Sequence, residues 1–205
     1  MKSIIILCGG RGKRMGQDKG LLNIKGIPLI IRIIERAMDV ADEVILVLRD
    51  ENQFKNYEKI LENLNFISKN LFVSFDFIKD QGPLMGIYSG LNQVSSNRVL
   101  IVPCDSPLVS RSFMEKMLNY DLTDFDVIIP KWPDGNLEPL HAIYRKEISK
   151  EISNLLKDGK KDVKSLYNLV KVKYVDVESL DKTGKSFLNL NKPEEVNRIA
   201  GFLNE

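Results

Sequence analysis

The stretch SIIILCGGRGKRMGQDKGLL, residues 3–22, decides the fold. Residues 4–7 form an apolar run that is typical of a strand covered on both faces of a sheet. Four glycines then lie between residues 9 and 16, and four basic side chains lie between residues 11 and 19. A turn between a strand and a helix needs one or two glycines. The surplus predicts a loop that wraps closely around a negatively charged group.

The chemistry of this loop suits phosphate. In an open parallel sheet, ligands bind at the carboxyl ends of the strands, where glycine lets backbone N–H groups approach phosphate oxygens. The spacing matches neither the GK[ST] ending of the P-loop nor GxGxxG. Arg11, Lys13, Arg14 and Lys19 supply the positive charge that a triphosphate requires. A solvated basic turn is the alternative interpretation.

Length and composition limit the possible classes of protein. The chain has 205 residues and a formal net charge of +2, so we expect one domain without a broad basic face for nucleic acid. We find no signal-peptide pattern and no run approaching the roughly 18–20 apolar residues of a membrane span. Cys8 and Cys104 form no spacing motif and are predicted to be buried free thiols. We therefore expect a soluble, cytoplasmic protein.

Apolar runs and helical periodicity alternate along the chain, which predicts an α/β fold. We expect a single domain over residues 1–205: a three-layer α/β/α, Rossmann-like fold with a mostly parallel central sheet and right-handed crossovers. Residues 1–109 are expected to bind one ligand and residues 110–205 another. The expected strands are 4–7, 44–48, 71–77, 99–102, 127–129, 140–144 and 172–177. The expected helices are 29–38, 54–64, 84–94, one after a capping box at Ser112, 148–156, 163–169 and one near Pro193.

Asp105 follows the fourth expected strand within PCDSP, residues 103–107. Two prolines hold it there, and a carboxylate is a ligand that suits Mg²⁺ beside phosphate oxygens. The alternative is that Asp105 caps a turn before Ser-Pro.

Five motifs together resemble one family. Residues 7–22 are similar to LAGGxSxRMGxDKxLL, 82–87 to GPLAGI, 103–107 to PCDxP, 138–140 to EPL and 187–195 to FxNxNTPEE. These are the signatures of the molybdenum cofactor guanylyltransferases, within the nucleotide-diphospho-sugar transferase superfamily. The motifs occur in the family's order and span nearly the whole chain.

The resemblance implies a nucleotidyltransferase fold and transfer of GMP from GTP to the terminal phosphate of molybdopterin, with release of pyrophosphate and dependence on Mg²⁺. Residues 1–109 would be the nucleotide-binding half and 110–205 the acceptor-binding half. It implies catalytic roles for Arg14, Lys19 and Asp105, with Asp105 as the metal ligand. The implied nucleotide-binding residues are Leu7, Cys8, Gly9, Gly10, Lys19, Asp76, Gly82, Pro83 and Asp105, and the implied acceptor-binding residues are Glu138, Asn189 and Asn191.

Several positions stay open at this stage. Asp80 competes with Asp76, and either is equally explained as a surface carboxylate. In an extended segment Asn189 and Asn191 point the same way, toward a pterin edge, a phosphate or only solvent. His141 receives no catalytic role. Trp132 either stacks on a pterin or belongs to a small packing cluster.

Three residues depart from the family pattern. Cys8 replaces alanine, a small change. Arg49 stands near a position where an asparagine or serine often contacts nucleotide. Lys192 replaces a threonine helix cap, which Glu194 and Glu195 partly offset.

The alternative functions keep the fold and change the chemistry. They are a related nucleotidyltransferase that uses CTP, one with another phosphorylated acceptor such as a cobinamide or sugar phosphate, and a non-catalytic nucleotide-binding regulator. Expected partners are GTP and molybdopterin, with transient contacts to other cofactor-biosynthesis proteins, and neither nucleic acid nor membrane.

Overall fold

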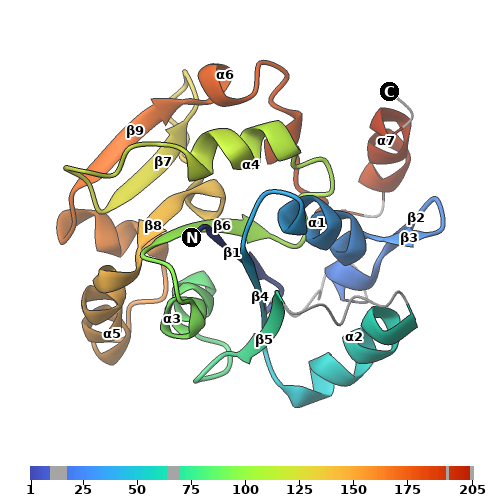
Figure 1. Ribbon diagram of the computed structural model, residues 1–205, viewed down its shortest axis with the longest axis horizontal. Helices are drawn as coiled ribbons and strands as arrows, with labels where there is room; N and C mark the ends of the chain where they lie inside the picture. The colour runs from blue at the N-terminus through green and yellow to red at the C-terminus, as the bar shows by residue number, and fades with distance from the viewer. Residues whose placement is uncertain (10–17, 64–69, 193, 204–205) are drawn as a thin grey trace.

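The computed structural model describes residues 1–9, 18–63, 70–192 and 194–203. Its main sheet has seven strands in the order β5-β4-β1-β6-β8-β7-β9 (Figure 1). Each expected strand has a counterpart in this sheet. The strands are β1 (Ser3–Leu7), β4 (Glu43–Leu48), β5 (Leu71–Phe75), β6 (Arg98–Pro103), β7 (Val127–Lys131), β8 (Ile143–Arg145) and β9 (Val172–Asp176).

The sheet is mostly parallel, as predicted. β1 pairs in parallel with β4 and β6, β4 with β5, and β7 with β9. β8 pairs antiparallel with both β6 and β7, and so joins the first four strands to the last two. The strands of the second half therefore extend the sheet of the first.

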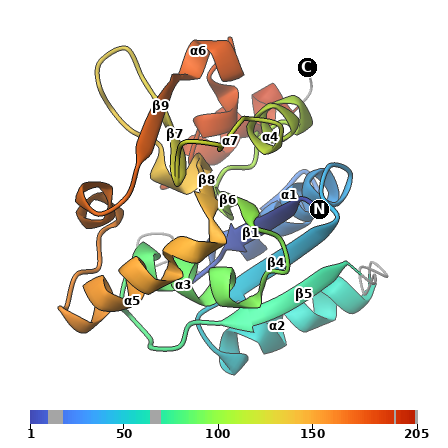
Figure 2. The same ribbon diagram turned by 60° about the vertical axis from the view of Figure 1, so that its left-hand side comes forward.

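Helices cover both faces of the sheet (Figure 2). Side chains alternate along a strand, so Ile4 and Ile6 pack into one apolar layer and Ile5 into the other. The helices of the Ile4 layer are α1 (Leu29–Met38), α2 (Glu51–Asn63), α4 (Arg111–Leu118) and α6 (Val177–Leu180). The opposite layer contains α3 (Pro83–Gln93), α5 (Ser149–Lys157) and the short 3₁₀ helix η4 (Val163–Asn168). The three-layer prediction is confirmed.

A third apolar cluster places the C-terminal segment beside the first loop. Ile199 of the helix α7 (Glu195–Phe202) packs against Leu22 and Ile24. Ile24 belongs to the hairpin of β2 (Asn23–Ile24) and β3 (Ile27–Pro28), and Leu22 directly precedes it. Leu190 joins the same cluster. Segments nearly the whole chain apart are thus brought together (Figure 1).

The helix predicted over residues 29–38 is confirmed as α1, and Pro28 before it pairs with Asn23 in β3. Local geometry changes three other features predicted from sequence. Ser110, whose backbone is extended, caps α4 in place of Ser112, and its hydroxyl accepts from Phe113 N at 3.1 Å. Pro139 begins a 3₁₀ turn, η2 (Pro139–His141), so the strand expected from residue 140 begins at Ile143. The 3₁₀ helix η4 replaces the helix expected over residues 163–169, and Pro193, where the last helix was expected to begin, lies outside the described residues. The remaining 3₁₀ helices are η1 (Lys19–Leu21), η3 (Lys146–Ile148) and η5 (Lys185–Phe187).

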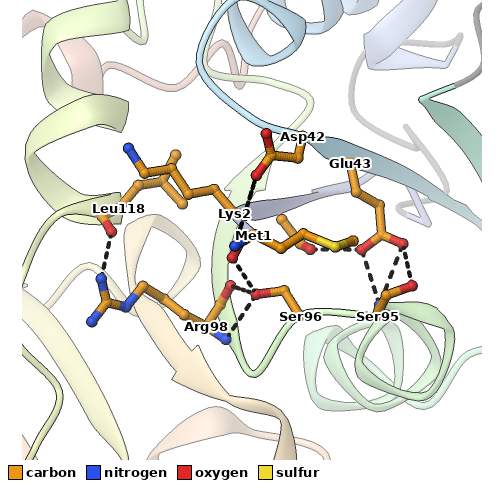
Figure 3. Close-up of polar contacts among 9 residues, drawn as sticks. Met1, Lys2, Asp42, Glu43, Ser95, Ser96, Arg98 and Leu118 are labelled. Carbon is orange, nitrogen blue, oxygen red and sulfur yellow. Dashed lines mark hydrogen bonds and ion pairs between the residues drawn. The ribbon is translucent and has the colours of Figure 1, made fainter.

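Polar side chains close the amino ends of the central strands (Figure 3). The buried carboxylate of Glu43 accepts from Ser3 Oγ at 2.6 Å, and from the backbone N–H and hydroxyl of Ser95, each at 3.0 Å. Ser96 Oγ donates to the Met1 carbonyl at 2.8 Å. This edge satisfies its own buried groups, as buried carboxylates require.

Among the residues that the structure describes, no helix has both the length and the apolar character needed to cross a membrane.

Candidate active site

A cavity of about 340 Å³ opens at the carboxyl ends of the central strands. Its wall contains most of the predicted nucleotide-binding residues, drawn from loops that follow β1, β5 and β6. These residues are Leu7, Cys8, Gly9, Lys19, Asp76, Gly82, Pro83 and Asp105. Gly10 and the predicted catalytic Arg14 lie outside the described residues, as do Arg11 and Lys13.

Two side chains of α2 hold the end of the first loop through Asp18. The Tyr57 hydroxyl donates to Asp18 Oδ1 at 2.6 Å, and the Gln53 amide donates to Asp18 Oδ2 and to the Cys8 carbonyl. Asp18 in turn accepts from Gly20 N at 3.1 Å and caps the short helix that carries Lys19. A side chain at Gly20 would collide with the Tyr57 hydroxyl. Gln53 and Tyr57 therefore fix the place of Lys19.

Lys19 joins three distant segments at one atom. Its Nζ donates to Asp105 Oδ2 at 2.7 Å and to Asn191 Oδ1 at 2.7 Å. The Lys19 and Asp105 side chains are 23% and 19% exposed, so the ion pair is partly shielded and still reachable from the cavity. Two residues expected to act together thus meet in the fold.

Asp76 follows β5, where its backbone N–H donates to the Leu48 carbonyl at 2.9 Å. Its carboxyl Oδ1 is buried and has no hydrogen-bond partner among the described residues. Burial raises the pKa of Asp76 to about 6; the charge of Arg49 opposes this shift and that of Asp80 adds to it. Gly9 lies so close that a Cβ there would be 3.0 Å from Asp76 Oδ2. Asp76 and Asp80 both line the cavity.

Gly82 has a conformation and a neighbour that exclude other residues. Its φ is 75°, and a Cβ would lie 2.9 Å from the carbonyl oxygen of Lys161. The contact brings the second half against the cavity rim. A glycine at this position is thus required by packing as well as by turn geometry.

The predicted acceptor-binding residues lie beside the cavity lining. Asn189 Oδ1 accepts from Ser106 Oγ at 2.5 Å, and Asn191 Oδ1 accepts from Lys19. Both amide oxygens therefore contact first-half residues. Glu138 Oε1 accepts from Trp132 Nε1 at 2.8 Å. Asn191 thus contacts Lys19 of the Lys19–Asp105 pair, whereas Glu138 contacts Trp132 and His141.

His141 and Trp132 belong to an aromatic cluster. The His141 ring packs edge-to-face on Phe113 and Phe187, with centroids 6.2 and 5.1 Å apart, and Trp132 packs on Phe187 at 5.6 Å. Trp132 is partly buried and its indole N–H is bonded, which favours the packing interpretation. His141 Nε2 lies 2.9 Å from Ser106 Oγ, a contact that the sequence did not predict.

The donor set suits a metal that shares its coordination with a ligand. Within residues 1–9, 18–63, 70–192 and 194–203, no group of three or more His, Cys, Asp or Glu side chains is arranged to hold an ion. Asp105 offers one hard oxygen donor at the cavity wall. Mg²⁺ commonly binds through one or two carboxylates together with phosphate oxygens and waters. The described residues therefore fit Mg²⁺ held jointly with a triphosphate.

The two cysteines follow neighbouring strands at the cavity wall. Leu7 of β1 pairs with Pro103 of β6, so Cys8 and Cys104 are adjacent, and both are buried and free, as predicted. Burial raises the pKa of the Cys8 thiol well above its usual range, and the neighbouring Cys104 thiol adds to this.

The other two departures from the family pattern have local explanations. Arg49 pairs with Asp50, the Nε to Oδ2 distance being 3.4 Å. Glu195 Oε2 accepts from the backbone N–H groups of Asn191 and Lys192 at 2.7 and 3.0 Å, and these bonds lower the pKa of Glu195. The residue in the cap position of α7 is Glu194, which makes no side-chain capping bond, and Glu195 instead fixes the backbone that leads into the helix.

The comparisons with known proteins agree with this geometry. Residues 4–176 match the family model described as the MobA-like NTP transferase domain. The chain belongs to this family. It is therefore an enzyme, a nucleotidyltransferase.

Relatives in this family match the chain over nearly their whole length. The chain is 36% identical over 199 residues to the probable molybdenum cofactor guanylyltransferase of Methanothermobacter thermautotrophicus, covering 96% of this chain and 98% of that one. The corresponding Methanosarcina mazei protein is 32% identical, with 100% and 92% covered.

Solved structures give the same fold. Molybdopterin-guanine dinucleotide biosynthesis protein A from Archaeoglobus fulgidus superposes with a TM-score of 0.79 at 25% identity, covering 100% of this chain and 99% of that chain. The 4-diphosphocytidyl-2C-methyl-D-erythritol synthase of Anaerococcus prevotii superposes at 0.74 with 18% identity, covering 100% and 96%, and shows the fold alone.

Proposed function

We propose that this family member transfers GMP from GTP to the terminal phosphate of molybdopterin and releases pyrophosphate, with Mg²⁺ as its metal. The observation that carries the proposal is the position of Lys19 Nζ, 2.7 Å from Asp105 of the first half and 2.7 Å from Asn191 of the second. A cation at that position faces both the side assigned to nucleotide and the side assigned to acceptor.

Positioning and charge neutralisation supply most of the catalysis in this reaction. Lys19 stabilises the negative charge that grows on the α-phosphate when the acceptor phosphate attacks it. Asp105 would hold Mg²⁺, which would supply further charge neutralisation to the triphosphate. The attacking phosphate is already ionised at neutral pH, so no side chain needs to act as a general base.

Asp76 supplies the acceptor atom that a guanine base needs. Its buried Oδ1 has no partner among the described residues, and burying such an oxygen is unfavourable unless a donor pairs with it. Guanine presents two adjacent donors, N1–H and the 2-amino group, which match a carboxylate. Cytosine offers only its 4-amino group as a donor. We propose that Asp76 binds the base and favours GTP over CTP.

The acceptor half contributes Asn189, Asn191 and Glu138. Asn191 touches Lys19 directly, whereas Asn189 is attached to the Asp105 loop through Ser106. Leu190 N also donates to the Asp105 carbonyl at 2.8 Å, so the segment between the two asparagines is fixed to that loop. The division at residue 109 into a nucleotide half and an acceptor half is part of this proposal.

The test is a turnover assay with each of the four NTPs, Mg²⁺ and molybdopterin, following pyrophosphate. We expect GTP to be used at least tenfold better than CTP. Asp105→Asn should abolish turnover while its thermal melt stays close to that of the unaltered protein. A preference for CTP would make the enzyme a cytidylyltransferase. Turnover only with another phosphorylated acceptor would overturn the molybdopterin assignment, and GTP binding without turnover on any acceptor would favour a regulator.

A further inference from the structure

Polar side chains form a line from Asn189 into the second half. Ser106 Oγ donates to Asn189 Oδ1 at 2.5 Å and lies 2.9 Å from His141 Nε2. On the other side of the ring, His141 Nδ1 lies 3.4 Å from Glu138 Oε2, and the two atoms are close but not hydrogen-bonded. Glu138 Oε1 accepts from Trp132 Nε1 at 2.8 Å. The line joins two residues assigned to the acceptor, Asn189 and Glu138, and all of its members lie behind the residues that line the cavity.

The centre of this line is buried polar surface that the core does not need. Ser106 is 0% exposed and His141 is 1% exposed, between the rings of Phe113 and Phe187. An apolar side chain would fill that space without the cost of burying imidazole and hydroxyl groups. The polar pair therefore has a purpose other than filling volume.

Proton counting determines how the line is ordered. Ser106 has one hydroxyl proton, and in this arrangement it goes to Asn189 Oδ1. The Ser106 oxygen can then only accept from His141, so a hydrogen bond between these two residues requires a proton on Nε2. With its oxygen bound to Ser106, the Asn189 carboxamide directs its NH₂ group elsewhere. If Nε2 lacked the proton, Ser106 would donate to the ring, and the carboxamide would have to turn over to donate to Ser106.

We propose that His141 is a positioning residue which, through Ser106, holds the Asn189 carboxamide with its NH₂ toward the acceptor. The acceptor group that this NH₂ binds is one that only accepts hydrogen bonds, such as the oxygens of a phosphate monoester. This rests on the proposed assignment of Asn189 to the acceptor side. Asn191 agrees with it, because its oxygen is bound by Lys19 and its NH₂ is likewise directed elsewhere.

The test combines three variants with a second background. His141→Phe preserves the aromatic packing and removes the N–H, Ser106→Ala removes the hydroxyl, and His141→Gln restores a donor near Nε2. Each is made alone and together with Asn189→Ala. KM for molybdopterin, kcat and the Kd for GTP are measured for all of them, after thermal melts establish folding.

We expect His141→Phe and Ser106→Ala each to raise KM for molybdopterin by roughly two- to tenfold, the factor that corresponds to one hydrogen bond. The Kd for GTP should stay within about twofold of the unaltered value, and His141→Gln should recover most of the loss. In the Asn189→Ala background neither substitution should add anything, because residues that act through one another are not additive. Equal losses in both backgrounds, or a loss of GTP affinity, would overturn the proposal.

A second readout needs no turnover, so it separates this proposal from the proposed function. The side-chain NH₂ signals of Asn189 in a ¹H–¹⁵N spectrum are assigned by their loss in Asn189→Ala. They should shift in Ser106→Ala and His141→Phe and return toward the original position in His141→Gln. Signals unchanged by Ser106→Ala would overturn the positioning role even if molybdopterin is the acceptor. If molybdopterin is not the acceptor, shifts of the expected kind would still support the orienting line.

Discussion

The Nζ of Lys19 lies 2.7 Å from the Oδ2 of Asp105, so the proposed metal ligand is already paired with a cation in this structure. A metal on the same carboxylate competes with Lys19 for its negative charge. We therefore expect metal binding to weaken the ion pair and to make the lysine more available to phosphate oxygens. The pair gives the site a way to neutralise Asp105 before substrate arrives.

Removing the lysine should separate metal binding from catalysis. In Lys19→Met we expect Mn²⁺, as a probe for Mg²⁺, to bind the nucleotide-free protein more tightly, because Asp105 has lost its competing charge. The same variant should lose kcat far more than affinity for GTP, since the lysine serves the transition state. Calorimetry and steady-state kinetics measure the two effects. Weaker Mn²⁺ binding in Lys19→Met would contradict this account, and a change confined to KM would make Lys19 a ground-state clamp.

Gly20 and Tyr57 should show linked effects on stability. Gly20→Ala places a methyl group against the Tyr57 hydroxyl, and overpacking of this kind typically costs about 1–3 kcal/mol. Tyr57→Phe removes that oxygen and should relieve part of the loss, although alone it breaks the bond to Asp18. Urea denaturation of the two single variants and the double variant measures the coupling. Tyr174→Phe, at an exposed tyrosine, is the control. Strictly additive losses would refute the contact.

Asp76 should make the ligand-free protein less stable as pH rises. Folding raises the pKa of its carboxyl to about 6, so between about pH 4 and 6 the native state binds more protons than the unfolded state. Stability falls through that window, and the deficit is fully present above it. Asp76→Asn should therefore melt at a higher temperature than the unaltered protein at pH 7.5, with the difference vanishing near pH 3.5. The same variant should bind GTP more weakly. Equal melting temperatures at pH 7.5 would show that burial of the charge costs nothing.

Glu43 should matter for stability and not for the site. Glu43→Ala leaves the buried Ser3 hydroxyl without a partner and removes the two bonds from Ser95 (Figure 3), which we expect to cost about 2–4 kcal/mol. Its neighbour Asp42, whose side chain is 64% exposed, is the matched control, and Asp42→Ala should change stability by less than about 1 kcal/mol. Chemical denaturation gives both values. A changed KM for GTP in folded Glu43→Ala would contradict the separation of the two sheet edges.

The sequence predicted the parts of the fold that depend on apolar pattern. Residues 4–7 and 99–102 are apolar enough to indicate strands covered on both faces, and the carboxyl ends of such strands meet at one edge. The convergence of Lys19 with Asp105 follows from that rule. The direction of β8 does not follow from its pattern, because a three-residue strand reads the same in either orientation.

Contacts made by docked side chains were not predictable from periodicity. Gln53 and Tyr57 lie one helical turn apart, and the pattern identifies them only as one face of α2; their bonds to Asp18 depend on where that helix packs. The same limit applies to Ser106 and His141, which are 35 residues apart and meet only through β8 and the loop after β6. Ser110 and Ser112 differ as caps only in backbone conformation, which sequence does not state.

The reactivity of the two buried thiols beside the cavity can measure how often this region opens locally. Cys8 and Cys104 are the only cysteines in the sequence, so every equivalent of alkylating reagent that the folded protein consumes reports on this one region. A reagent reaches these thiols only when the ends of β1 and β6 separate from the residues packed around them. If the protein closes again faster than the reagent reacts, the alkylation rate measures the free energy of this local opening. A ligand bound across the same strand ends should slow the reaction in proportion to its occupancy. Nucleotide binding can thus be timed on the unaltered protein, without a dye or a substitution.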